Sequence, residues 1–199
     1  LGAAFIPESG TVTFNATDTD NTITANGSSF YNLVFDGAGG VWTLQDDLYV
    51  NNNLAIASGA FVAGTNDITL VGNFLNSDTF TSDGTFTLEG SSASTISGNT
   101  IFYNFICVTA GKELTFTAGS TQDITGSLIL TGSGGNPLVL RSSSSGSWWY
   151  LNPTGTRTVQ YVDVQDCNNT NAAVITTFRS TDSGNNINWF FSIETLTWN

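Results

Sequence analysis

One stretch of this sequence occurs twice, 72 residues apart, and the residues around it repeat with it. Residues 30–35 read FYNLVF, and residues 102–107 read FYNFIC. Four further pairs of segments match at offsets of 72 to 74 residues: 10–14 with 84–88, 22–24 with 95–97, 42–44 with 114–116, and 54–56 with 128–130. A chain that repeats in this way builds its fold by stacking similar units.

The repeat divides the 199 residues into one domain with two flanking tails. Two copies cover residues 10–83 and 84–132, and a degenerate last part covers 133–191. The strand-like tails are residues 1–9 and 192–199. Segments such as 11–14 and 85–88 alternate apolar with hydroxyl side chains, and no window shows a helical stripe. This period of two predicts strands throughout.

The spacing of apolar residues distinguishes a solenoid from a hairpin sandwich. One series of apolar pairs recurs mostly every 19 to 23 residues, with a larger gap between Ile56 and Phe86, and a second series interleaves with it. Stacked coils produce such a period, whereas a sandwich has no reason to keep it. We therefore expect an all-β fold, a right-handed parallel β-helix (β-solenoid) of about eight coils built from the tandem repeat.

Three motifs in the last part are similar to a known type of module. Residues 137–142 (PLVLRS), 161–166 (YVDVQD) and 182–186 (DSGNN), together with Trp189, resemble a repeat module of large exported bacterial and archaeal cell-surface proteins. The resemblance implies a right-handed parallel β-helix at the cell surface. It brings no catalytic or binding residues with it.

Composition limits the partners and the chemistry. The formal net charge is −12, so a phosphate backbone or an anionic membrane would be repelled. No apolar run is long enough for a membrane helix, and the absence of Met with only one Lys favours an exported product, extracellular or at the cell surface. The absence of His excludes Ser-His-Asp and Cys-His catalysis and most transition-metal sites.

Carboxylates are the remaining candidates for catalysis or metal binding. Polysaccharide hydrolases use pairs of Asp or Glu, and Asp163 with Asp166 is the best such pair here. Asp163 alternates with apolar neighbours, which is also typical of a solvated strand face, so we predict no enzymatic activity. Asp46 and Asp47 suit turns as well as they suit Ca²⁺, and neither follows a calcium-loop pattern. We predict no metal and no cofactor.

Other residues suggest covalent links or sugar contacts. Cys107 and Cys167 are a possible disulfide in an exported protein, or separate core residues. Asn15, Asn26 and Asn168 begin glycosylation sequons. The cluster Trp148, Trp149 and Tyr150 either stacks on sugar rings or fills the last coils.

The apolar flanking segments suggest self-association. Soluble solenoids cover their end coils, but the residues at both ends of this chain are apolar and strand-like. If a tail pairs with a neighbouring molecule, head-to-tail contacts propagate into a filament, which we take as the leading hypothesis. The alternatives are a monomeric adhesive or carbohydrate-binding module and, third, a polysaccharide-degrading enzyme. The possible assembly contacts are Ala3, Phe5, Ile6, Phe190, Phe191, Ile193, Leu196 and Trp198.

Overall fold

The structure, a computed structural model, describes residues 8–192. Within this range the chain forms 24 strands and no helix, so no described segment is a helix that could cross a membrane. The strands pair in parallel, and in coils 1 to 6 most inward-pointing apolar residues lie opposite other apolar residues. Their sequence-predicted arrangement as a parallel β-solenoid of about eight coils is confirmed.

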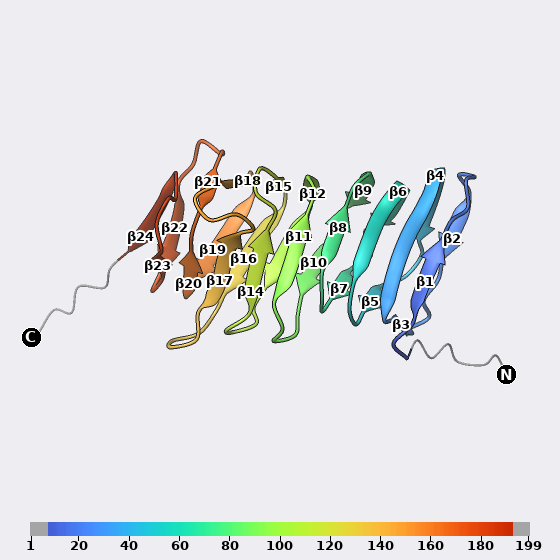
Figure 1. The fold of residues 1–199 in the computed structure, drawn as a ribbon, viewed down its shortest axis with the longest axis horizontal. Coiled ribbons are helices and arrows are strands. Elements are labelled where there is room, and N and C mark those ends of the chain that lie inside the picture. Colours follow the sequence, from blue (N-terminus) through green and yellow to red (C-terminus); the bar gives the residue numbers. More distant parts are fainter. Residues whose placement is uncertain (1–7, 193–199) are drawn as a thin grey trace, which may run out of the picture.

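The strands form three faces that run the length of the rod, numbered here in chain order (Figure 1). Face 1 consists of β1 (Thr11–Phe14), β4 (Asn32–Leu44), β6 (Leu54–Gly64), β8 (Phe74–Asn76), β11 (Ser94–Ser97), β14 (Glu113–Phe116), β17 (Leu138–Ser142), β20 (Val162–Val164) and β23 (Thr181–Asp182). Face 3 consists of β3 (Ser29–Phe30), β5 (Leu48–Val50), β7 (Ile68–Leu70), β10 (Thr85–Leu88), β13 (Asn104–Cys107), β16 (Ser127–Thr131), β19 (Thr156–Gln160), β22 (Ile175–Phe178) and β24 (Trp189–Ser192).

Face 2 lies between them and changes its pairing along the rod. It starts with β2 (Asn21–Ile23), the second halves of β4 and β6, and β9 (Thr79–Ser82), which pair with one another. It continues beside β9 as a four-stranded sheet of β12 (Thr100–Phe102), β15 (Thr121–Ile124), β18 (Trp149–Pro153) and β21 (Cys167–Asn169). Coil 1 is therefore β1 to β3, coil 8 is β20 to β22, and β23 with β24 begins a ninth.

The three-faced coil corrects two details of the sequence interpretation. The gap between Ile56 and Phe86 is a change of face, because Ile56 lies on face 1 and Phe86 on face 3. The repeated stretch also changes face, since residues 32–35 lie in β4 and residues 104–107 in β13. The repeat offset thus equals three coils plus two further faces. The repeat is real in sequence, but its copies are not superimposed coils, because every face needs the same alternation of apolar and polar residues.

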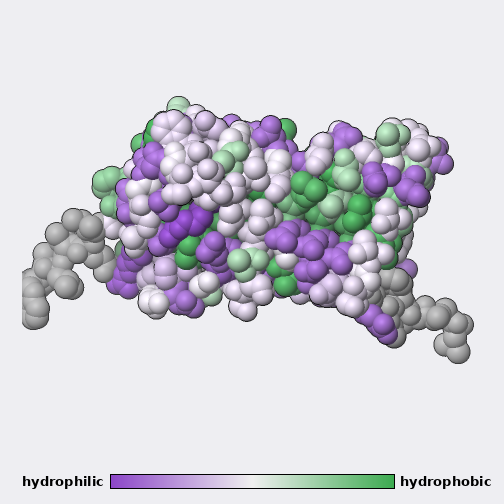
Figure 2. Space-filling view, in the orientation of Figure 1, coloured by the Kyte–Doolittle hydropathy of each residue, from purple (hydrophilic) through white to green (hydrophobic). Residues whose placement is uncertain are grey.

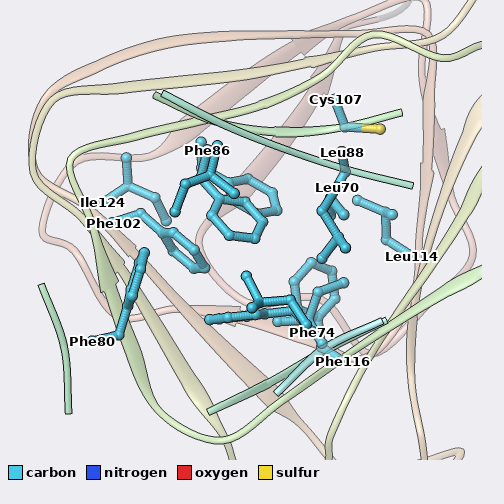
Figure 3. Close-up of a cluster of buried hydrophobic side chains, with 14 of the residues drawn as sticks. Leu70, Phe74, Phe80, Phe86, Leu88, Phe102, Cys107, Leu114, Phe116 and Ile124 are labelled. Atoms are coloured by element: carbon cyan, nitrogen blue, oxygen red, sulfur yellow. The ribbon is translucent and has the colours of Figure 1, made fainter. Parts of the chain in front are cut away.

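Inward-pointing side chains fill a continuous aromatic and aliphatic interior. In coils 4 and 5, Phe74, Phe80, Phe86 and Phe102 come from all three faces and meet at the centre (Figure 3). The ring centroids of Phe74 and Phe86 are 4.9 Å apart, and those of Phe86 and Phe102 are 5.0 Å apart. Such ring pairs each contribute about 0.5–1.5 kcal/mol beyond the burial of their area.

Amide and carboxylate side chains hold the corners of successive coils together. Between faces 3 and 1, Asn53 Oδ1 accepts the backbone N–H of Asn73 at 3.1 Å, and Asn73 Oδ1 accepts that of Thr95 at 2.8 Å. Between faces 2 and 3, Asp47 Oδ1 accepts the N–H of Asp67 at 2.9 Å. These bonds satisfy backbone donors that the turns leave outside the strand ladders.

Two glycines lie where adjacent coils approach most closely, so a substitution there tests the spacing of the coils. Gly126 and Gly155 lie on successive coils, and Thr156 N–H donates to the carbonyl oxygen of Gly126 at 2.9 Å. A Cβ on Gly155 would lie 1.7 Å from that oxygen, whereas a Cβ on Gly134 would have no neighbour closer than 3.9 Å.

We expect Gly155→Ala to lower the free energy of unfolding by about 1–3 kcal/mol, because the added methyl group forces adjacent coils apart. The matched variant Gly134→Ala should change it by less than about 0.5 kcal/mol. Urea unfolding followed by tryptophan fluorescence measures both. Equal stability of the two variants would contradict the stacking of Gly155 on Gly126.

Candidate functional site

The two ends of the rod are where the apolar interior meets the surface. In the described range 8–192, five hydrophobic residues that pack against the core are only partly buried. Val12, Phe14 and Ala16 belong to coil 1, and Trp189 and Phe191 belong to the ninth coil. At one end Phe14 stacks on Phe35 of coil 2, with centroids 5.7 Å apart; at the other, Trp189 and Phe191 stack at 5.9 Å. Strands β1, β23 and β24 each have a neighbour on one side only among the described strands.

The predicted assembly contacts are only partly described. Phe190 is 57% exposed on the outer side of β24, and Phe191 is half-buried against the core. The other six lie outside the described residues: Ala3, Phe5, Ile6, Ile193, Leu196 and Trp198.

Charge is distributed unevenly along the rod. Every Lys and Arg lies after residue 111, whereas ten of the 16 carboxylates lie before it. Coils 1 to 4 therefore carry only negative charges. From residue 133 to 192, three Arg balance three Asp. The coil 1 end is thus strongly acidic, and the opposite end is close to neutral.

A groove opens at the corner of faces 2 and 3 in coils 1 to 3. Its volume is about 310 Å³, and it is lined by Gly27, Ser28, Asp47, Tyr49, Asp67 and Thr69, besides the edge of Leu48. We call it the Tyr49 groove. Tyr49 is 39% exposed. Burial, and then the charge and hydrogen bond of Glu89, raise the pKa of the Tyr49 hydroxyl, so Glu89 stands beside the phenol.

This groove cannot be recognised in the sequence, because it depends on the register between coils. Tyr49 is opposite Thr69, and Thr69 is opposite Thr87, two residues before Glu89. Tyr49 and Glu89 are therefore two coils apart in the fold but 40 residues apart in sequence. Only the pairing of coils brings them together. No sequence signal marks Tyr49 beyond its place among outward-facing strand residues.

The aromatic cluster, for which sugar stacking and core filling were both considered, does not form one platform. Trp149 is fully buried and stacks on Phe116 with centroids 3.9 Å apart. Trp148 points outward, 36% exposed, and its indole N–H donates to the carbonyl of Asn185 at 3.0 Å. Tyr150 is half-buried. Trp149 is therefore a core residue, and the three aromatic residues do not share a stacking surface.

The candidate catalytic carboxylates are both engaged. Asp163 Oδ2 forms an ion pair with Arg141 at 2.8 Å, and Ser183 donates to Oδ1. Burial raises the pKa of the Asp163 carboxyl, but the bonds from Arg141 and Ser183 and the charge of Arg141 outweigh burial and lower it. Asp166 is buried and accepts hydrogen bonds from Gly146 N–H and the Asn185 amide.

Asp46 and Asp47, which were considered as calcium ligands, instead accept backbone hydrogen bonds at turns. Asp46 accepts the N–H groups of Ala25 at 2.7 Å and Asn26 at 2.6 Å, which fixes the wall of the Tyr49 groove. Among the described residues no group of three or more His, Cys, Asp or Glu is arranged to hold a metal ion.

Of the two interpretations of the cysteines, a disulfide or separate core residues, the structure shows the second. Cys107 lies in β13 on face 3 of coil 5, and Cys167 lies in β21 on face 2 of coil 8, both buried and both free. Three coils correspond to about 14 Å along the rod, beyond the Cα separation that a disulfide spans. Both are core residues.

The sequons differ in accessibility. Asn15 and Asn26 are exposed, and Asn26 has a positive φ of 49° in its turn. Asn168 is half-buried in β21, opposite Tyr150. Glycosylation of Asn15 and Asn26 is compatible with this fold, whereas Asn168 is in a strand ladder.

Lys112 is a second feature that sequence analysis missed. Its side chain is fully buried, and its ammonium donates to the carbonyls of Val71, Gly90 and Ser92 at 3.2, 3.0 and 2.6 Å. Burial lowers the pKa of this amine. The single lysine thus ties three successive turns together at the corner of faces 3 and 1.

The Asp163–Arg141 pair predicts a pH-dependent contribution to stability. Because the pKa of Asp163 is lowered in the folded state, its carboxylate stabilises the fold at pH values above its ordinary pKa of 3.8. This stabilisation is lost as the pH falls through the lowered pKa. Because both side chains are about a fifth exposed, we expect Asp163→Asn to lower stability by about 1 kcal/mol at pH 7. Thermal unfolding at several pH values should show this difference closing below about pH 4. Asp83→Asn, at an exposed turn, is the control, and a pH-independent difference would contradict the assignment.

The two buried thiols predict a simple chemical result. Burial raises the pKa of the Cys107 thiol, and raises that of Cys167 well above its ordinary value, so neither is a ready thiolate. We expect both to resist a thiol reagent in the native protein and to react after unfolding without reductant. If the denatured protein contained no titratable thiol, the two cysteines would be shown to form a disulfide.

Comparison of the chain with protein-family models, with curated proteins and with solved structures gives no match. The parallel β-helix that the motifs implied is present in the structure. The more specific resemblance to modules of exported cell-surface proteins stays a prediction from those motifs.

Proposed function

We propose that this chain is a structural subunit of an extracellular filament in which copies stack end to end. The observation that carries the proposal is the position of the partly buried core residues. They lie in coil 1 and in the ninth coil, so the interior is open at both ends of the described rod. A second copy placed there would continue the core, burying more of Phe14 on one side and of Phe191 on the other. Such burial contributes about 25 cal/mol per Å² of apolar surface.

The strand edges support the same arrangement. The backbone N–H of Asn32 in β4 donates to the carbonyl oxygen of Gly10, and Thr11 of β1 lies opposite Asn32. Because alternate residues of a parallel strand bond to the same neighbour, the backbone groups of Thr11 and Thr13 point to the open edge of β1. A strand of another molecule can pair there and extend the sheet.

The charge distribution favours one orientation. Two coil 1 ends would bring together carboxylates such as Glu8, Asp18 and Asp20, without a compensating cation in coils 1 to 4. Docking of the near-neutral end on the acidic end avoids this repulsion. A head-to-tail contact of unlike surfaces does not close on itself, so it propagates into an open filament.

The sides of the rod are compatible with close packing. Figure 2 shows mostly residues of intermediate hydropathy on one side, with hydrophobic residues gathered over the half nearer coil 1. We propose an extracellular setting on the basis of the composition and of the resemblance to exported surface proteins. We propose no catalytic role, because the acidic pair singled out from the sequence is engaged by Arg141 and by backbone and amide donors. A monomeric adhesive module is the second candidate, favoured by the Tyr49 groove.

Electron microscopy of Thr13→Pro against Thr13→Val tests the proposal. Thr13 is exposed, and proline is tolerated at an edge strand whose N–H faces outward, but it removes the donor that an incoming strand needs. We expect filaments from the wild type and from Thr13→Val, and single rods from Thr13→Pro. Circular dichroism verifies that both variants keep the fold.

Sedimentation separates the contribution of the terminal segments from that of the rod ends. Deleting residues 193–199 removes the segment that follows β24 and leaves the described coils intact. Weaker but persistent assembly would assign bonding to both the rod end and the tail. Wild-type protein that stays monomeric at high concentration, or a Thr13→Pro variant that assembles like the wild type, would rule out end-to-end stacking.

A further inference from the structure

The Tyr49 groove has the features of a small binding site on the side of the rod, independent of end-to-end assembly. Its volume of about 310 Å³ is within the range of ligand pockets, at the small end. One wall is the turn at Gly27 and Ser28, which is held by the Asp46 carboxylate through two backbone N–H groups. The floor is β5 and β7. The groove is therefore formed before any ligand arrives.

Tyr49 provides an aromatic surface that lies along the rod. Its phenol reaches Glu89 of coil 4, although Tyr49 itself belongs to coil 2. The ring must therefore extend across Thr69 of coil 3, which is its register partner. With 39% of the residue exposed, one side of the ring is available to a ligand. Flat apolar faces with polar edges, such as those of pyranose rings, suit this surface.

The carboxylates of the groove supply acceptors of fixed position. Asp47 Oδ1 accepts the N–H of Asp67, and Asp67 Oδ1 accepts that of Thr85 at 2.7 Å. Each aspartate is thereby held by one oxygen. The second oxygen of each has no hydrogen-bond donor among the described residues and is left for a ligand.

The surrounding charge selects the ligand class. Asp47, Asp67 and Glu89 lie in or beside the groove, and coils 1 to 4 contain no Lys or Arg. This potential repels uronic acids and attracts an ammonium group. We propose that the Tyr49 groove binds an amino sugar of a glycan, with the pyranose stacked on Tyr49 and its amine and hydroxyl groups donating to Asp47 and Asp67.

Calorimetric titration with a glucosamine tetrasaccharide at about 0.15 M salt tests the site. The N-acetylated tetrasaccharide is the neutral comparison, and a galacturonate tetrasaccharide is the acidic one. We expect saturable binding of the glucosamine oligomer, at least ten-fold weaker binding of the neutral one and none of the acidic one. Equal affinity for the neutral or acidic oligomer would overturn the assignment to an amino sugar.

Variants distinguish stacking in the groove from general attraction of a cation to an acidic protein. Tyr49→Ala should weaken binding at least ten-fold, whereas Tyr103→Ala removes a tyrosine of similar exposure, 43%, outside the groove and should leave it unchanged. Asp47→Asn keeps an acceptor for Asp67 N–H and should lower the preference for the amine. Spermine should bind wild type and Tyr49→Ala alike. If Tyr49→Ala binds the glucosamine oligomer as the wild type does, the contact is charge alone and the proposal is wrong.

Discussion

The parallel pairing of each coil with the next is the interaction on which the rest of this structure depends. It sets successive coils about 4.8 Å apart and places like residues in columns. Phenylalanines then stack inside, as Phe35 does on Phe61 with centroids 4.3 Å apart. At the corners, Asn and Asp side chains reach the next coil's backbone, as Asn53 does for Asn73. Short Asn and Asp side chains suit the corner positions, because these positions need short hydrogen-bonding groups.

Lys112 shows how the same rule accommodates an exception. A buried ammonium is unfavourable unless it is surrounded by acceptors. Here three carbonyls from two earlier turns surround it, those of Val71, Gly90 and Ser92, further along the corner where Asn53 and Asn73 form an asparagine ladder. A cation that points into a corner can therefore replace a series of neutral side chains. It also fixes the relative position of coils 3 to 6 from a single residue.

The same stacking leaves two kinds of surface with different uses. In the described part of the chain, the ends carry strand edges without a neighbour and partly buried rings such as Phe14 and Trp189, which suit another copy of the chain. The sides expose regular columns of side chains, on which Tyr49 and the carboxylates nearby form a groove. In a filament the groove would recur once per subunit. Weak individual sugar contacts would then combine through multivalency, so that assembly and adhesion would reinforce each other.

The sequence by itself determined the strand content, the alternation of inward and outward side chains and the stacking of coils, because a period of two and a period of about 20 residues are local and visible properties. For Trp149 it left two interpretations, sugar stacking and core filling, and favoured the core. Only the tertiary structure decided that three strands form a coil, that Cys107 and Cys167 are separated by three coils, and that Tyr49 meets Glu89. These facts depend on how many residues each corner takes before the next coil begins. Alternation within a strand carries no information about that register, whereas pairing between coils fixes it.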